Sequence, residues 1–334
     1  MNDVLWAVAS YFNPSGSRRR LANYRVFRER LGVPLLTVEW SREGGYELGP
    51  GDADQLVQVR GGDLMWQKER LLNLAVDRLP ADCDVVAWLD CDVVFGRADW
   101  PREAVARLGS AAMVQIYDEV VYLAREPFDA LVRPGPLDRR PVRHVRRGLM
   151  GERQPPLSEA RFGQSNDDVS YFVAKPSVGF AWAARRDFLR RHPLFDRCVI
   201  GGGDSAYTMS AVGQFERLAA RHRYTRAQRD FLAPLAARLA DEVGTRIDAV
   251  PGRLFHLWHG ELEHRRYGSR YDVLRDFAFD PARGLALDRD GVWSWSDVAP
   301  GLPQAVRAYF AGRLEDGVPA EPAAEVAGRR SALA

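Results

Sequence analysis

The sequence is poor in cysteine, lysine and long apolar runs. Its 334 residues include three cysteines, and an odd number without a C-x-x-C pair argues against a disulfide framework and fits a reducing cytoplasm. The apolar run at 4–9 comes too early for a signal peptide, so we expect a cytoplasmic protein with no transmembrane segment. Only Lys68 and Lys175 are lysines, and the formal net charge of +2 gives no overall field that favours nucleic acid.

The remaining composition is that of a globular protein, with 46% hydrophobic and 28% charged residues. Strand and helix patterns alternate from the N-terminus, which predicts an α/β fold with a mixed, mainly parallel sheet flanked by helices. The first predicted elements are strands at 4–9, 34–40, 56–59 and 85–89 and helices at 21–31 and 63–79. In such a sheet, ligands bind beyond the carboxyl ends of the strands.

Several polar residues fall on that edge or on the helix at 63–79. They are Asn13, Arg18–Arg20, Glu39, Lys68 and Asn73. For the arginines and Glu39, solvated ends of a helix and a strand are an equally good interpretation.

Further elements follow the strand at 85–89. A helix begins near Trp100, strands are predicted at 111–117 and 178–184, and helices at 185–191 and 205–212. The helical pattern at 214–243 contains Pro234, which predicts two helices. We expect residues 1–311 to form a single domain.

Two segments lack periodicity. Residues from about 125 to 166 are rich in proline and arginine, which predicts either a mobile basic lid over an anionic ligand or a surface insertion. Residues 312–334 are predicted to be a disordered tail.

The stretch at 85–95 carries the strongest chemical signal. A buried strand ends in Asp90-Cys91-Asp92, and two acids in an apolar context favour a divalent metal at the sheet edge, although solvated acids in a turn are the alternative. Farther along, Gly201–Gly203 precede Asp204 at a helix start, where the backbone can approach a ligand closely. Two imidazoles, His256 and His259, are candidate nitrogen ligands for the same metal.

Together these features resemble the nucleotide-sugar glycosyltransferases of the GT-A fold. The closest pattern is that of the β4-galactosyltransferase-like branch and related bacterial and viral transferases. The resemblance spans about residues 4–271. It includes the helix 66–73 with an aromatic-x-basic-x-x-Leu-x-Asn pattern, the D-x-D and the strand from Gly179 to Arg186. The Gly-rich acidic motif and the late histidines complete it.

The resemblance implies a metal-dependent transfer of a sugar from a nucleoside-diphosphate sugar, first of all a UDP-sugar, to a hydroxyl of a glycan or small-molecule acceptor. The implied cofactor is Mn²⁺ or Mg²⁺, held by Asp92 and His259 with His256 as second choice. The implied donor-binding residues are Asn13, Arg20, Glu39, Lys68, Asn73 and Asp90. The implied acceptor-binding residues are Gly179, Trp182, Gly202 and Gly203, with Asp204 as the catalytic base.

The branch carries Gly-Gly-Glu-Asp with the second acid as base, whereas this chain has Ser205 there. Asp204 is then itself the base, or the stereochemical course differs. Two alternatives remain: a haloacid-dehalogenase-like, Mg²⁺-dependent phosphohydrolase, for which only Lys175 is available as the lysine between the motifs, and a non-catalytic carbohydrate or nucleic-acid binder.

Overall fold

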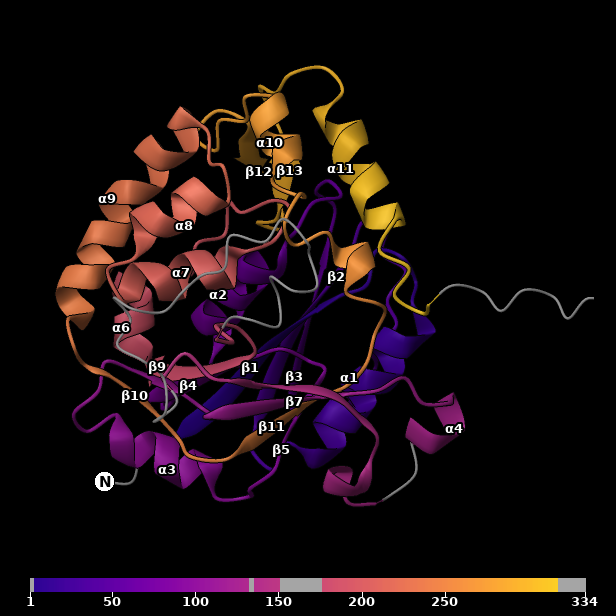
Figure 1. Cartoon of the computed structure of the whole chain (residues 1–334), viewed down its shortest axis with the longest axis vertical. Helices are drawn as coiled ribbons and strands as arrows, with labels where there is room; N and C mark the ends of the chain where they lie inside the picture. The colour runs from indigo at the N-terminus through magenta and orange to yellow at the C-terminus, as the bar shows by residue number, and fades with distance from the viewer. Residues whose placement is uncertain (1–2, 132–134, 151–175, 318–334) are drawn as a thin grey trace, which may run out of the picture.

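The computed structural model describes residues 3–131, 135–150 and 176–317 (Figure 1). Every strand and helix predicted before residue 118 is present, with ends that differ by a few residues. These elements are β1 (Leu5–Phe12), α1 (Arg18–Arg30), β2 (Leu35–Ser41), β3 (Gln55–Arg60), α2 (Lys68–Arg78), β4 (Val85–Leu89), β5 (Val93–Phe95), α3 (Trp100–Arg107) and β6 (Met113–Gln115).

The second half of the chain adds shorter strands and most of the helices. Its strands are β7 (Glu119–Leu123), β8 (Val142–Arg147), β9 (Ala181–Arg185), β10 (Ile247–Ala249), β11 (Arg253–His256), β12 (Leu285–Leu287) and β13 (Trp293–Trp295). Its helices are α4 (Phe128–Leu131), α6 (Arg186–Arg191), α7 (Gly203–Ala211), α8 (Phe215–Arg221), α9 (Arg226–Val243), α10 (Asp272–Asp276) and α11 (Leu302–Ala311).

The central sheet has seven strands in the order β10-β6-β9-β4-β1-β2-β3. Neighbouring strands are parallel except at β9, which is antiparallel to both β4 and β6. The predicted mixed, mainly parallel α/β sheet is therefore confirmed. The chain leaves β1 toward β2 on one side and β4 lies on the other, so the carboxyl ends of β1 and β4 flank a point where ligands bind in open α/β sheets.

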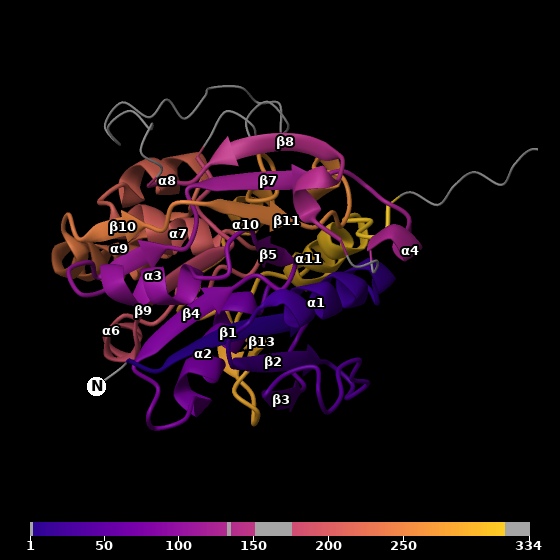
Figure 2. The same ribbon diagram turned by 90° about the horizontal axis from the view of Figure 1, so that it is seen from below.

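Alternating side chains of the central strands divide the core between the two faces of the sheet. Val8, Val86 and Trp88 face a cluster that includes α2, α7 and α9, whereas Ala7, Val85 and Ala87 face a cluster with α1 and α3. Figure 2 shows α1 and α3 on one side of β1 and β4 and α2 on the other.

A second sheet has four strands in the order β5-β11-β7-β8. β5 follows β4 after three residues, Asp90, Cys91 and Asp92, so the D-x-D turn leads from the central sheet into the second one. β12 and β13 form a separate hairpin. Within the described residues, no helix is both long enough and apolar enough to span a bilayer.

The structure changes two expectations about local structure, the start of α2 and the position of the break between the two helices predicted at 214–243. α2 begins at Lys68 and not near 63, because Trp66 and Gln67 hydrogen-bond to the backbone carbonyls of Val199 and Trp293 and hold the preceding chain outside the helix. α9 continues through Pro234. The break in the helical segment lies instead at Arg223, whose backbone is left-handed (φ 51°), before the capping box of Thr225.

Two predicted irregular segments are partly ordered. The segment at about 125–166 contains α4 and the strand β8, which pairs with β7, and its part from 151 onward lies outside the described residues. The tail expected from residue 312 is ordered through Gly317, and Glu315 within it is buried by contacts described below. Residues 318–334 lie outside the described residues.

Arg186 closes the carboxyl end of α2. The buried guanidinium donates to the carbonyl oxygens of Val76, Leu79 and Pro80. We predict that Arg186→Ala lowers the free energy of unfolding by about 2–4 kcal/mol, because several buried carbonyls lose a charged donor. Urea denaturation measures the change. Arg190→Ala, at an exposed position of α6, is the matched control and should stay within about 0.5 kcal/mol of wild type; equal losses in both variants would contradict this role.

Candidate active site

A cavity of about 670 Å³ opens at the carboxyl ends of β1 and β4. Nine of the sequence-predicted site residues line it: Arg20, Lys68, Asp90, Asp92, Gly179, Gly202, Asp204, His256 and His259. They come from segments that are far apart in the sequence, so the fold itself assembles the site.

Strand pairing brings the two histidines to the D-x-D turn. β11 runs antiparallel to β5, with His256 opposite Val93, and the backbone N–H of Leu257 donates to the carbonyl oxygen of Asp92 at 2.9 Å. Because β11 ends at that point, His256 and His259 both lie beside the Asp92 side chain.

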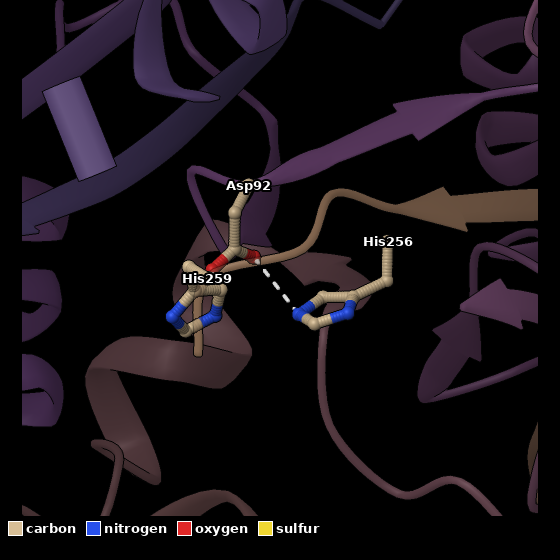
Figure 3. Close-up of side chains that lie close together, drawn as sticks. All are labelled: Asp92, His256 and His259. Carbon is tan, nitrogen blue, oxygen red and sulfur yellow. Dashed lines mark ion pairs between the residues drawn. The ribbon is translucent and has the colours of Figure 1, made fainter. Parts of the chain in front are cut away.

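The carboxylate of Asp92 faces both imidazoles (Figure 3). Its Oδ2 lies 2.8 Å from Nε2 of His259, and its Oδ1 lies 3.9 Å from Nε2 of His256. One ligand atom from each residue can be chosen so that all three lie within 4.8 Å of one another. All three side chains are buried.

The protonation states and the free polar atoms of this cluster fit a metal site. Burial, with a smaller contribution from Arg265, lowers the pKa of His259 to about 4, and burial also lowers the pKa of His256 well below its usual range. Both rings are therefore neutral at neutral pH, the form that binds metals. Oδ1 of Asp92 has no hydrogen-bond partner among the described residues. One carboxylate and two imidazoles suit Mn²⁺ and similar divalent ions.

Lys68, the first residue of α2, forms an ion pair with Asp90. Burial opposes its positive charge, but Asp90, Asp204 and Glu69 outweigh that effect and raise the pKa of Lys68. Asp90 is thereby engaged with a cation of its own, whereas Asp92 faces the histidines. The two acids of the D-x-D turn thus have different surroundings.

Asp204 stands in the first turn of α7, near Glu69. Its Oδ1 accepts a hydrogen bond from the backbone N–H of Ser205 at 2.6 Å. Two glycines leave the space these carboxylates need, because a Cβ on Gly179 would lie 2.4 Å from Oδ2 of Asp204 and one on Gly203 would lie 2.5 Å from Cδ of Glu69. Gly179 and Gly203 therefore allow Asp204 of α7 and Glu69 of α2 to pack closely against the backbone.

The C-terminal segment 313–317 covers the metal cluster from behind. Glu315 accepts hydrogen bonds from Arg20 (Nε to Oε2, 2.6 Å) and from Arg313 (Nη2 to Oε1, 2.8 Å). Its Oε1 lies 3.9 Å from Nδ1 of His259, an atom with no hydrogen-bond partner among the described residues. Asp316 accepts from Oγ of Ser17 and from the first backbone N–H groups of α1.

An arginine and tyrosine wall, formed by Arg265, Tyr267, Arg270 and Tyr271, completes the lining of the cavity. Nη2 of Arg265 donates to Nε2 of His259 at 2.9 Å. Nη2 of Arg270 donates to the hydroxyl of Tyr271 at 2.8 Å, and its Nη1 donates to the hydroxyl of Tyr309 at 3.4 Å.

Five sequence-predicted residues do not line this cavity: Asn13, Glu39, Asn73, Trp182 and Gly203. The first three form hydrogen bonds to other residues of the protein. Asn13 bonds to Ser17 and Glu47, Glu39 accepts from Glu47, Leu48 and Gln58, and Asn73 bonds to Leu194 and Asp196. Trp182, 1% exposed, belongs to the core, and it lines with Gly203 a smaller cavity beneath Asp204. Lys175, the lysine of the phosphohydrolase alternative, lies outside the described residues.

Five further residues of the site are not predicted from the sequence: Glu69, Arg265, Arg270, Tyr271 and Glu315. The arginine–tyrosine pairs near 265–271 are a visible signal, since they follow the histidine motif directly. Glu315 has no such signal, because it stands in a stretch of low complexity and its partners Arg20 and His259 are far away in the sequence.

The pKa of Glu69 generates a stability prediction. Burial raises this pKa from 4.5 to about 8, with Lys68 opposing the shift and Asp204 adding to it. The folded protein therefore binds a proton that the unfolded chain releases, and stability falls as pH rises from about 4.5 to about 8. Between pH 5 and 8, in metal-free buffer, the unfolding free energy of wild type relative to Glu69→Gln should fall by about 1.4 kcal/mol per pH unit.

Urea denaturation at several pH values tests this expectation. Glu43→Gln, at an exposed position, is the matched control and should give a curve parallel to wild type. A constant difference between wild type and Glu69→Gln across the range would show that Glu69 is not protonated in the folded protein.

Comparisons with known proteins find only weak similarities to this chain. No protein-family model and no curated protein sequence matches the chain. Among solved structures, glucosyl-3-phosphoglycerate synthase from Mycobacterium tuberculosis, in complex with Mn²⁺, uridine diphosphate and phosphoglyceric acid, is 14% identical, with 86% of this chain and 82% of that chain covered and a TM-score of 0.39.

TarS of S. aureus is 10% identical, with 93% of this chain and 71% of that chain covered and a TM-score of 0.35. The 4-diphosphocytidyl-2C-methyl-D-erythritol synthase of Anaerococcus prevotii is 9% identical, with 75% and 87% covered and a TM-score of 0.31. Similarities this weak assign neither a family nor an activity.

Proposed function

We propose that the protein is a GT-A-type glycosyltransferase that moves a sugar from a nucleoside-diphosphate sugar, first of all a UDP-sugar, to an acceptor hydroxyl. One observation carries the proposal: the second acid of a D-x-D turn converges with two neutral histidines at the carboxyl edge of a parallel sheet. The same cavity contains a separate carboxylate, Asp204, at a helix start. A leaving-group site and a base site in one cavity are what such a transfer needs.

Asp92, His256 and His259 are the residues that would hold Mn²⁺ or Mg²⁺. When bound, the metal supplies a Lewis acid that stabilises negative charge on the departing diphosphate. The protein prepares this position with one ionised carboxylate and two uncharged imidazoles. Glu315 lies behind His259, where an outer carboxylate can fix the orientation of the ring.

Lys68 and Asp90 act together on the donor side. The ammonium of Lys68 keeps its proton, because the nearby carboxylates of Asp90 and Asp204 raise its pKa. One of its three N–H donors is used by Asp90, so others remain for phosphate or sugar oxygens. Asp90, held by this ion pair, is positioned to accept a hydrogen bond from a hydroxyl of the donor.

Asp204 is the proposed base. Its Oδ1 is held by the backbone N–H of Ser205, while Oδ2 lies next to the bare Cα of Gly179. A carboxylate fixed in this way can accept the proton of an acceptor hydroxyl as the hydroxyl attacks. Glu69 is protonated below about pH 8 and adds no competing negative charge there.

Metal binding provides the first test. Asp92→Ala should weaken Mn²⁺ binding by about 100-fold or more, since it removes the only carboxylate of the three-residue cluster. Isothermal titration calorimetry measures the affinity, and circular dichroism checks the fold. Asp241→Asn, an exposed acid on α9, is the control and should bind like wild type. Undiminished turnover of UDP-sugars by Asp92→Ala in EDTA would overturn the mechanism.

The base position provides the second test. Asp204→Asn should lower kcat for UDP-sugar turnover, including hydrolysis with water as acceptor, by about 10²–10⁴-fold. Binding of UDP with Mn²⁺ should persist, because Asp204 is not among the metal-cluster residues. Ser205→Ala is the matched control, since a hydroxyl is a poor base at neutral pH; its kcat should stay within a few-fold of wild type. A kcat that falls in Ser205→Ala but not in Asp204→Asn would overturn the role of Asp204 as the base.

A further inference from the structure

The cavity divides into two halves with different charge balance. On the metal side, Glu315 pairs with Arg20 and Arg313, and Arg265 donates to His259. On the Asp204 side, Arg270 packs against Gly201 and hydrogen-bonds to Tyr271. The hydroxyl of Tyr271 in turn lies against Gly202, the N-cap residue immediately before α7, because a Cβ added at Gly202 would come within 2.5 Å of it.

Arg270 is a buried cation with no acidic partner among the described residues. Its exposed fraction is 5%, and its guanidinium donates to two tyrosine hydroxyls. Within the same residues, its Nε has no hydrogen-bond partner. A buried charge left in this state costs several kcal/mol unless an opposite charge joins it. The guanidinium fork matches phosphate and carboxylate oxygens.

The proposed donor does not supply a partner for the positive charge of Arg270. A divalent metal would offset charge on the diphosphate, and Arg20 and Arg313 next to the metal cluster are already paired with Glu315, although Arg313 and Arg270 both donate to the hydroxyl of Tyr309. The N-terminus of α7, a nine-residue helix, contributes a second favourable field for an anion at the Asp204 end. Gly201 and Gly202 both have positive φ (87° and 89°), so no side chain separates this backbone from Arg270 and Tyr271.

We infer that the acceptor carries an anionic group, a phosphate or a carboxylate, which Arg270 and Tyr271 bind while the hydroxyl to be glycosylated lies at Asp204. This inference rests on the proposed glycosyl transfer and names its acceptor class. It predicts that neutral sugars and polyols are poor acceptors, and that the anion orients the hydroxyl toward the base.

Calorimetry on the wild-type chain provides the test. The protein is first saturated with UDP and Mn²⁺, which fills the donor side and tests the proposed function separately. Glycerol 3-phosphate, glycerate and glycerol are then titrated. We expect glycerol 3-phosphate or glycerate to bind at least about tenfold more tightly than glycerol, the gain from one charged hydrogen-bonded pair. Which of the two binds better distinguishes phosphate from carboxylate.

Variants assign the effect to Arg270. Arg270→Gln should remove the preference for the anion, whereas Arg307→Gln, an exposed arginine on α11, should keep it. UDP and Mn²⁺ binding on the same sample reports whether the cavity is still formed. If Arg270→Gln does not fold, Tyr271→Phe removes the hydroxyl that holds the guanidinium and should weaken anion binding several-fold.

The outcomes separate the two claims. If the wild-type protein does not bind UDP and Mn²⁺, the proposed function is overturned. Normal UDP and Mn²⁺ binding with equal affinity for glycerol and its anionic analogues would overturn only the inference. A change in discrimination between UDP-glucose and UDP-glucuronate in Arg270→Gln, with no change for the acceptor pairs, would assign Arg270 to the donor sugar and also overturn it.

Discussion

The buried carboxylate of Asp92 is the constraint on which the rest of the site depends. An ionised acid in an apolar setting is costly unless positive charge compensates it. Its nearest neighbours, His256 and His259, have lowered pKa values and are neutral, so they supply ligand atoms without charge. The positive charge has to come from a bound ion or from the arginines behind the histidines. The short pairing of β5 with β11 creates this situation, because it fixes all three side chains at one place.

The C-terminal segment 313–317 fixes some of the arginines near His259 through ion pairs, and it connects parts of the chain that are far apart in the sequence. Glu315 bridges Arg20 of α1 and Arg313, and Asp316 closes the N-terminus of α1. A carboxylate at a helix N-terminus and one between two arginines are both favourable placements. Arg20, which the sequence suggested as a donor ligand, is therefore first a partner of Glu315. The same contact positions the segment against His259, so the end of the described chain belongs to the site.

Local patterns were sufficient for the sheet, its layers and the acids at the end of β4, because burial periodicity and strand-end chemistry are visible in the sequence. They were insufficient where contacts between residues far apart in the sequence determine which side chains face the cavity. Asn13, Glu39 and Asn73 stand at strand ends or on an amphipathic helix, yet each has internal hydrogen bonds that no local pattern reveals. Pro234 suggested a helix break, but the left-handed backbone of Arg223 and the cap at Thr225 determine where the break falls.

Net charge illustrates the same difference between composition and geometry. The chain has a formal charge of +2, which excludes a strong overall field. Inside the cavity, however, the negative charges are those of Asp90, Asp92 and Asp204, while the guanidinium of Arg270 donates only to hydroxyl groups among the described residues. A small ligand experiences this local arrangement and not the sum over the surface, since burial removes the screening by water. A nearly neutral protein can therefore hold a cation at one end of its cavity and an anion at the other.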